Sequence, residues 1–224
     1  MKLVCALALS ALLAADNPAP GLEETIRRVQ AALDATRSLS AAFNQETKGK
    51  TWGGAQTLKG RLWIQKPLKM RWEYTDPPGL LIVADGVALW RHDQKENTVY
   101  REELSDLLES GSPGLFLAGE TPLTALFDIE LSPPPKNATL KNDGQIRLRL
   151  FPKSFRSGVK GMALTVDDGA YLPREILIVD HLGARSKLAF TDMQTNEAAP
   201  AELFTFTPPS GARVVSLTKD KNKE

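Results

Sequence analysis

The chain of 224 residues has little of what catalytic and nucleic-acid-binding proteins commonly use. It has one cysteine and two histidines, and 28 basic residues nearly balance 27 acidic ones, for a net charge of +1. Proteins that bind nucleic acid need a basic excess to neutralise phosphates, so this class is not expected. Disordered chains combine high net charge with low hydrophobicity. Here 42% of the residues are hydrophobic, which indicates a folded globular protein.

The single cysteine, Cys5, lies in a segment with the features of an export signal. Residues 1–15 carry one charge, Lys2, followed by apolar and small residues up to Ala15. The run is too short to span a membrane and is typical of a secretory signal peptide. We expect cleavage near Ala15 and export to the periplasm. The remaining chain, 16–224, would have no cysteine, which excludes disulfides, thiol catalysis and cysteine-ligated zinc.

One amphipathic helix is predicted at the start of the exported chain. The apolar residues Leu22, Ile26, Val29 and Leu33 recur at helical spacing, and the pattern ends near Arg37. Such a helix normally buries its apolar stripe on the rest of the protein.

From residue 39 onward the hydrophobic period changes to two, which is typical of strands. The dipeptides Asp-Gly at 85–86, 143–144 and 168–169 predict hairpin turns between such runs. Many short antiparallel strands predict a large curled sheet or barrel in a single domain. The expected strands are 40–49, 57–66, 69–75, 79–84, 87–93, 97–101, 127–132, 138–142, 145–151, 159–167, 173–181, 185–192 and 203–206.

The strand pattern is interrupted at 102–127. This stretch contains apolar positions at helical spacing, broken by glycine and proline. It predicts short helices inserted between strands. Two readings stay open at this point: a flap across the sheet, or an ordinary packed connection between two halves of the sheet.

The sequence offers no convincing catalytic set, and we expect no catalytic residues, no metal site and no cofactor. It has no G-x-S-x-G motif, and His92 and His181 lie far apart in the chain. What stands out is apolar excess, since 80–84 and 176–179 are apolar on both sides of the strand. A curled sheet closed by apolar helices can enclose a pocket for a lipid-like ligand. The same residues could equally pack a dry core, and composition does not separate the two.

Four segments, taken in order, resemble the motifs of one known family. They are 42–45 (AFNQ), 60–77 (GRLWIQKPLKMRWEYTDP), 83–90 (VADGVALW) and 204–211 (FTFTPPSG). They resemble motifs of the LolA family, the periplasmic carriers of outer-membrane lipoproteins. The ordered match runs from about residue 22 to residue 215.

The resemblance implies a mainly β fold with some α-helix: an incomplete, half-open antiparallel β-barrel closed by a helical lid over a hydrophobic cavity. Residues 102–127 would be the lid, and the first helix part of the cover. The resemblance also implies a monomeric chaperone, not an enzyme. It would receive acylated lipoproteins from an inner-membrane ABC transporter complex and pass them to an outer-membrane, LolB-like acceptor.

The resemblance also suggests which residues act. The family usually has arginine before the proline of the central motif, where it helps to hold the lid closed. This chain has Lys66, which can bond lid carbonyls but lacks the planar fork of arginine, so we expect a looser lid latch. Met70 replaces an aromatic of the family and keeps the site apolar. The expected apolar contacts in the cavity and lid are Leu33, Trp63, Met70, Trp72, Leu115, Phe116 and Leu117.

Three alternatives are open to test. The first is a lipid or glycolipid carrier, or a lipid-sensing module, of the same fold. The second is a secreted hydrolase, disfavoured because no nucleophile–base pair is visible. The third is an outer-membrane barrel, disfavoured by the helical insert and the charges on many strands.

Overall fold

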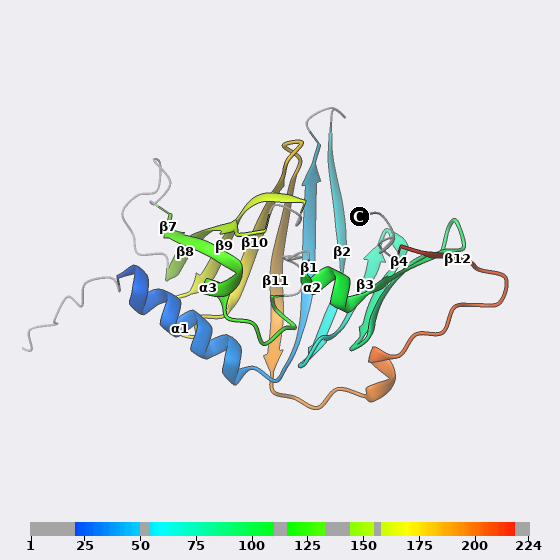
Figure 1. The fold of residues 1–224 in the computed structure, drawn as a ribbon, viewed down its shortest axis with the longest axis horizontal. Coiled ribbons are helices and arrows are strands. Elements are labelled where there is room, and N and C mark those ends of the chain that lie inside the picture. The colour runs from blue at the N-terminus through cyan, green and yellow to red at the C-terminus, as the bar shows by residue number, and fades with distance from the viewer. Residues whose placement is uncertain (1–20, 50–53, 110–115, 133–143, 155–157, 218–224) are drawn as a thin grey trace, which may run out of the picture.

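The computed structural model describes residues 21–49, 54–109, 116–132, 144–154 and 158–217 (Figure 1). The expected signal peptide 1–15, the expected strand 138–142 and the predicted site residue Leu115 lie outside the described residues.

The predicted N-terminal helix is confirmed as α1, Leu22–Ala35. Glu23 and Glu24 in its first turn suit the positive end of the helix dipole. Its apolar stripe is buried at Val29 and Leu33, which are 0% and 5% exposed. The helix is therefore docked along one side, as its periodicity predicts.

Twelve strands of the described residues form one sheet in the order β12-β6-β5-β4-β3-β2-β1-β11-β10-β9-β8-β7. All neighbours pair antiparallel except β12, which runs parallel to β6. The outermost strands, β12 and β7, do not pair with each other, so the sheet stays open as expected for an incomplete barrel. The strands are β1 (Ser38–Lys48), β2 (Ala55–Gln65), β3 (Lys69–Asp76), β4 (Pro78–Asp85), β5 (Ala88–Asp93), β6 (Thr98–Glu103), β7 (Phe127–Leu131), β8 (Gln145–Pro152), β9 (Val159–Asp167), β10 (Pro173–Asp180), β11 (Arg185–Thr195) and β12 (Arg213–Ser216).

The two faces of the sheet have different partners. We call the face against which α1 packs the inner face, and the opposite one the outer face. Successive side chains of a strand point to opposite faces. In β2, Leu62 and Ile64 are buried on the inner face, while Arg61 and Trp63 alternate with them on the outer face.

The insert between β6 and β7 crosses the inner face. These strands lie near opposite edges of the sheet, so the chain between them must traverse almost its full width. It contains α2 (Leu104–Glu109) and α3 (Leu123–Leu126), which lie with α1 in front of the strands in Figure 1. Leu104 and Leu123 are buried in the same cluster as the apolar residues of α1. Of the two readings of this stretch, the structure therefore has a layer across the sheet, and we call α1 and the described insert together the cover.

A second crossing segment runs over the outer face. After β11 the chain forms a 3-10 helix, η3 (Ala201–Phe204), and then β12, the last strand of the described residues. The Phe206 ring lies 5.6 Å from the Trp90 ring and 5.8 Å from the His92 ring, so this segment covers outer-face aromatics. The expected strand at 203–206 is wrong, because Leu203 and Phe204 belong to η3 and Phe206 packs its ring against Trp90 and His92 without joining a backbone ladder. The edge strand β12, only four residues long, was not predicted.

Candidate functional site

The interior between the cover and the inner face is an apolar cluster. Nine strands contribute to its sheet side: β1, β2, β3, β4 and β7 to β11. Burial of a large apolar side chain such as Leu62 or Met70 contributes roughly 1.5–3 kcal/mol. The cover side consists of Val29, Leu33, Leu104, Phe116, Leu117, Ala118 and Leu123. The cover has one apolar face, and that face packs against the sheet. If the cover moved away from the sheet, it would lose these apolar contacts.

Four of the predicted contact residues meet in this cluster. Leu33, Met70, Phe116 and Leu117 are each at most 7% exposed there. The Phe116 ring packs edge-on against Phe127, with centroids 6.3 Å apart. The structure thus brings residues of the first helix, the central motif and the insert together, although they are far apart in the chain.

Trp63 lies elsewhere. Because β2 alternates, Leu62 and Ile64 point inward and Trp63 points to the outer face. There the guanidinium of Arg61 lies 5.4 Å from the centre of its ring. Trp63 is therefore not part of the interior cluster. The prediction failed because the aromatic pattern alone did not show which side chains of β2 face inward.

Trp72 belongs to an aromatic group at one side of the interior that sequence reasoning did not assemble. Its ring is 5.1 Å from Phe43 and 6.4 Å from Phe190, and Phe43 is 5.1 Å from Tyr74. Burial raises the pKa of Tyr74 to about 12, and its hydroxyl donates a hydrogen bond of 2.8 Å to Gln45 Oε1. The period of two that relates Met70, Trp72 and Tyr74 was the signal that could have predicted that Tyr74 lies on the same face of β3.

Lys66 ties the turn after β2 to the cover. Its Nζ donates a 2.7 Å hydrogen bond to the backbone carbonyl of Leu33, in the last turn of α1. Burial lowers the Lys66 pKa, and the nearby carboxylates of Asp34 and Glu120 oppose this shift. The bond goes to α1 and not to the insert 102–127, which the prediction named as the lid. The same carbonyl also accepts the Thr36 N–H at 3.1 Å, so Lys66 adds a second donor at the end of the helix.

The insert has its own ties to the same region. The backbone N–H of Leu68 donates to the carbonyl of Ala118 at 2.8 Å. The N–H of Leu123, at the start of α3, donates to Gln30 Oε1 of α1 at 2.8 Å. The two parts of the cover are thus joined to each other and to the turn between β2 and β3.

Comparison with known proteins places this arrangement in a family. The model of the family "Outer membrane lipoprotein carrier protein LolA" matches residues 34–207. The chain belongs to the LolA family. An outer-membrane lipoprotein carrier protein of Chromobacterium violaceum is 32% identical over 96% of this chain and 99% of its own. One of Dechloromonas aromatica is 32% identical over 80% of this chain and 82% of its own.

The LolA-family chain also resembles a solved structure in its fold. An uncharacterized conserved protein from Thermus thermophilus superposes with a TM-score of 0.52 at 16% identity, covering 87% of this chain and 98% of the other. Among the described residues of this family member, no helix is both long enough and apolar enough to cross a membrane.

In this LolA-family chain the end of α1 is fixed by a second side chain, that of Asn196. Its Oδ1 accepts a 2.7 Å hydrogen bond from the Arg37 N–H, and its Nδ2 donates at 3.0 Å to the Ala35 carbonyl. Asn196 has a φ of 61°, a left-handed conformation that asparagine tolerates better than most residues. The link from α1 to β1 is therefore held from both sides of Thr36, while Lys66 bonds the helix two residues before Ala35.

Proposed function

We propose that this chain shelters the acyl chains of lipoproteins between its cover and the inner face of its sheet. The observation that carries the proposal is an apolar interior closed by an amphipathic cover, in a member of a lipoprotein-carrier family. The predicted contacts Leu33, Met70, Trp72, Leu115, Phe116 and Leu117 would touch the acyl chains. This role needs no catalytic residue, metal or cofactor, so we propose a chaperone rather than an enzyme.

The energetics favour a cover that occupies the interior when no ligand is bound. A triacylated lipoprotein would expose dozens of methylenes to water, at about 0.8 kcal/mol each. A ligand that enters must displace Phe116, Leu117 and Leu33 from the sheet, and the lost contacts offset its own gain. The net affinity stays moderate, which allows release to an acceptor.

The test is titration of the purified protein with a fluorescent acyl probe. We expect saturable binding, and we expect Phe116→Asp to weaken it about tenfold or more, because a buried carboxylate opposes apolar contact. Leu182→Asp is the matched control, since Leu182 is 84% exposed and should leave binding unchanged. Circular dichroism checks that each variant is folded. Trp72→Ala, at a half-buried position, gives a second measurement if Phe116→Asp does not fold.

We further propose that the chain acts in the periplasm as one domain, 16–224, after removal of 1–15. The donor would be an inner-membrane ABC transporter complex and the recipient an outer-membrane acceptor. The family description and the expected export signal support this. Depletion of the protein followed by membrane fractionation is the test, with lipoproteins expected to accumulate at the inner membrane. An unchanged distribution would count against the transport route while leaving acyl binding intact.

A further inference from the structure

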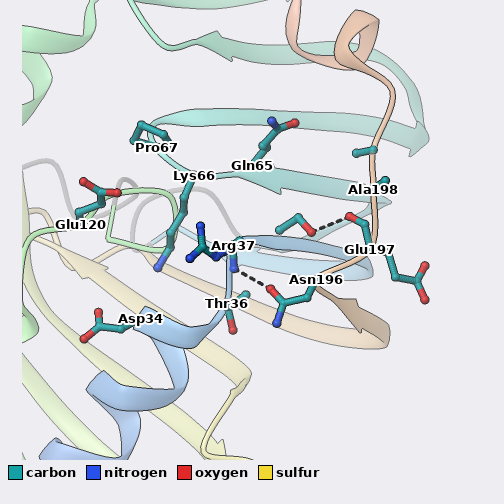
Figure 2. A pocket seen from close by; sticks show the side chains of 12 residues that line it. Asp34, Thr36, Arg37, Gln65, Lys66, Pro67, Glu120, Asn196, Glu197 and Ala198 are labelled. Carbon is teal, nitrogen blue, oxygen red and sulfur yellow. Dashed lines mark hydrogen bonds between the residues drawn. The ribbon is translucent and has the colours of Figure 1, made fainter.

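A polar cleft of about 870 Å³ lies where the cover meets the end of the sheet (Figure 2). Three parts of the fold line it: the end of α1, the turn after β2 with the nearby insert, and the segment that follows β11. Its charged residues are Asp34, Arg37, Lys66, Glu120 and Glu197. In Figure 2 the Lys66 side chain passes between Glu120 and Arg37.

The cleft and the apolar interior share a boundary. Lys66 lines the cleft, and its Nζ bonds the carbonyl of Leu33, whose side chain is buried in the interior cluster. Glu120 likewise lines the cleft two residues after Ala118, which is fully buried in that cluster. Movement of α1 away from Lys66 would therefore make one continuous opening from the interior into the cleft.

Several polar groups of the cleft are available for a ligand. Within the described part of the chain, the side chains of Arg37, Glu120 and Glu197 have no hydrogen-bond or ion-pair partner. Both signs of charge are present, together with the amide of Gln65. Such a lining can satisfy backbone N–H and C=O groups and side chains of either charge.

We propose that this cleft binds the polypeptide segment that directly follows the acylated residue of a cargo lipoprotein. The inference rests on the proposed function, because it presupposes acyl chains in the interior. A peptide advances at most about 3.3–3.6 Å per residue, so the first few residues after the acylated one must lie near the interior's opening. Their backbone polar groups need partners there, and the cleft offers them.

Two other clefts of the described structure are not lined by the cover. One, of about 170 Å³, shares Ser38 and residues 197–199 with the larger cleft and also includes Arg61 and Trp63 of the outer face. The other, of about 250 Å³, is lined by β3, β4 and Gln94. Neither is lined by a residue of the cover, whereas the 870 Å³ cleft is lined by both α1 and the insert.

Disulfide crosslinking tests the proposal. The probe is a synthetic triacylated lipopeptide with a cysteine at the fourth residue after the acylated one. The protein carries Cys5→Ser, so that the introduced thiol is the only one. Ala198→Cys places that thiol where the cleft adjoins the 170 Å³ one, and the Arg37 and Glu120 variants described below separate the two, since these residues line the larger cleft only. The control positions are exposed alanines: Ala125→Cys on α3, and Ala55→Cys at the start of β2, near the β1–β2 turn.

We expect the lipopeptide to crosslink Ala198→Cys at least fivefold more than either control. Equal crosslinking at the three positions, or a preference for Ala125→Cys or Ala55→Cys, would overturn the cleft assignment. Displacement of the fluorescent acyl probe by the same lipopeptide is measured in parallel. Displacement without crosslinking at Ala198→Cys refutes the cleft alone, whereas absence of displacement refutes the proposed function.

An affinity measurement supplies a second arm. Arg37→Ala and Glu120→Ala should each weaken lipopeptide binding about three- to tenfold and leave binding of the acyl probe unchanged. Lys95→Ala and Glu96→Ala are the charge-matched controls, since both residues are exposed in the turn between β5 and β6. If the cleft variants matched these controls, the cleft would have no part in cargo binding.

Discussion

At the scale of single residues, Gly60 shows how closely the inner face is packed. A Cβ added there would collide with the backbone carbonyl of Glu73 and lie 2.6 Å from the Phe43 ring. Neither neighbour is the free end of a flexible side chain. Only glycine therefore lets β2 and β3 approach each other beneath the aromatic group.

Gly60→Ala should destabilise the protein by about 2 kcal/mol or more, because overpacking forces the strand and the Phe43 ring apart. Urea unfolding at neutral pH gives the free energy. Gly161→Ala in β9 is the matched control, since its nearest contact would be at 3.7 Å and thus ordinary. Equal stability of the two variants would show that the β2–β3 contact is not tight.

Asp85 organises the turn between β4 and β5. Its Oδ1 accepts hydrogen bonds of 2.8 Å from the N–H groups of Val87 and Ala88, and its Oδ2 accepts one of 2.8 Å from the Trp90 indole. Burial acts to raise the Asp85 pKa, but the hydrogen bonds from Ala88, Trp90 and Val87 outweigh it and lower the pKa below the usual 3.8.

The pH dependence follows from that direction. Because the folded pKa is the lower one, the ionised carboxylate stabilises the fold fully above the unfolded value, and this is lost as pH falls through the folded value. Asp85→Asn should lower the free energy of unfolding by about 1–2 kcal/mol at pH 7. The single oxygen of the asparagine amide can accept from Val87 and Ala88, but its NH2 group cannot accept from the Trp90 indole. The difference from the parent should shrink near pH 3. A difference in unfolding free energy that did not vary with pH would contradict the role of the charge.

At the scale of elements, α1 has two attachments of different character. Asn196 holds the backbone on both sides of Thr36, whereas Lys66 contributes a single bond to the last turn of the helix. Loss of the Lys66 bond leaves the two Asn196 bonds on either side of Thr36 intact. We therefore expect Lys66 to affect how often α1 opens more than whether the protein folds.

Lys66→Leu should accelerate hydrogen exchange in the last turn of α1 and alter transfer of the acyl probe to acceptor vesicles. The unfolding free energy should change by less than about 1 kcal/mol, because one hydrogen bond is lost and a partly buried charge is removed with it. Lys66→Arg should restore parental exchange. Lys160→Leu removes an exposed lysine of β9 and is the control. Release kinetics equal in Lys66→Leu and the parent would remove Lys66 from the mechanism.

At the scale of the whole molecule, periodicity predicted most of the strands and α1, because those segments bury one face and expose the other. It failed where tertiary contact decides structure. The 203–206 segment has a strand-like composition but packs Phe206 against Trp90 and His92. It also could not orient Trp63, since either face of β2 satisfies the same alternation, and only the pairing of all strands fixes which face the cover occupies.

The site was predictable in part for the same reason. The motif around Lys66 and Met70 and the apolar insert indicated an interior, but not that the Lys66 bond goes to Leu33. Asn196 was not predicted, because its two bonds depend on where β11 ends relative to α1. Contacts of this kind join residues about 160 positions apart and have no local signal.

Because β12 and β7 do not pair with each other, the sheet has a property that a closed cylinder lacks. In a closed cylinder the strand number and stagger fix the bore, so a wider bore requires ladder hydrogen bonds to be broken. An open sheet can change its radius through small changes of twist shared among many strands, with every ladder kept. Its capacity is therefore continuous rather than fixed, and cargoes of unequal bulk could be enclosed by one scaffold without local unfolding.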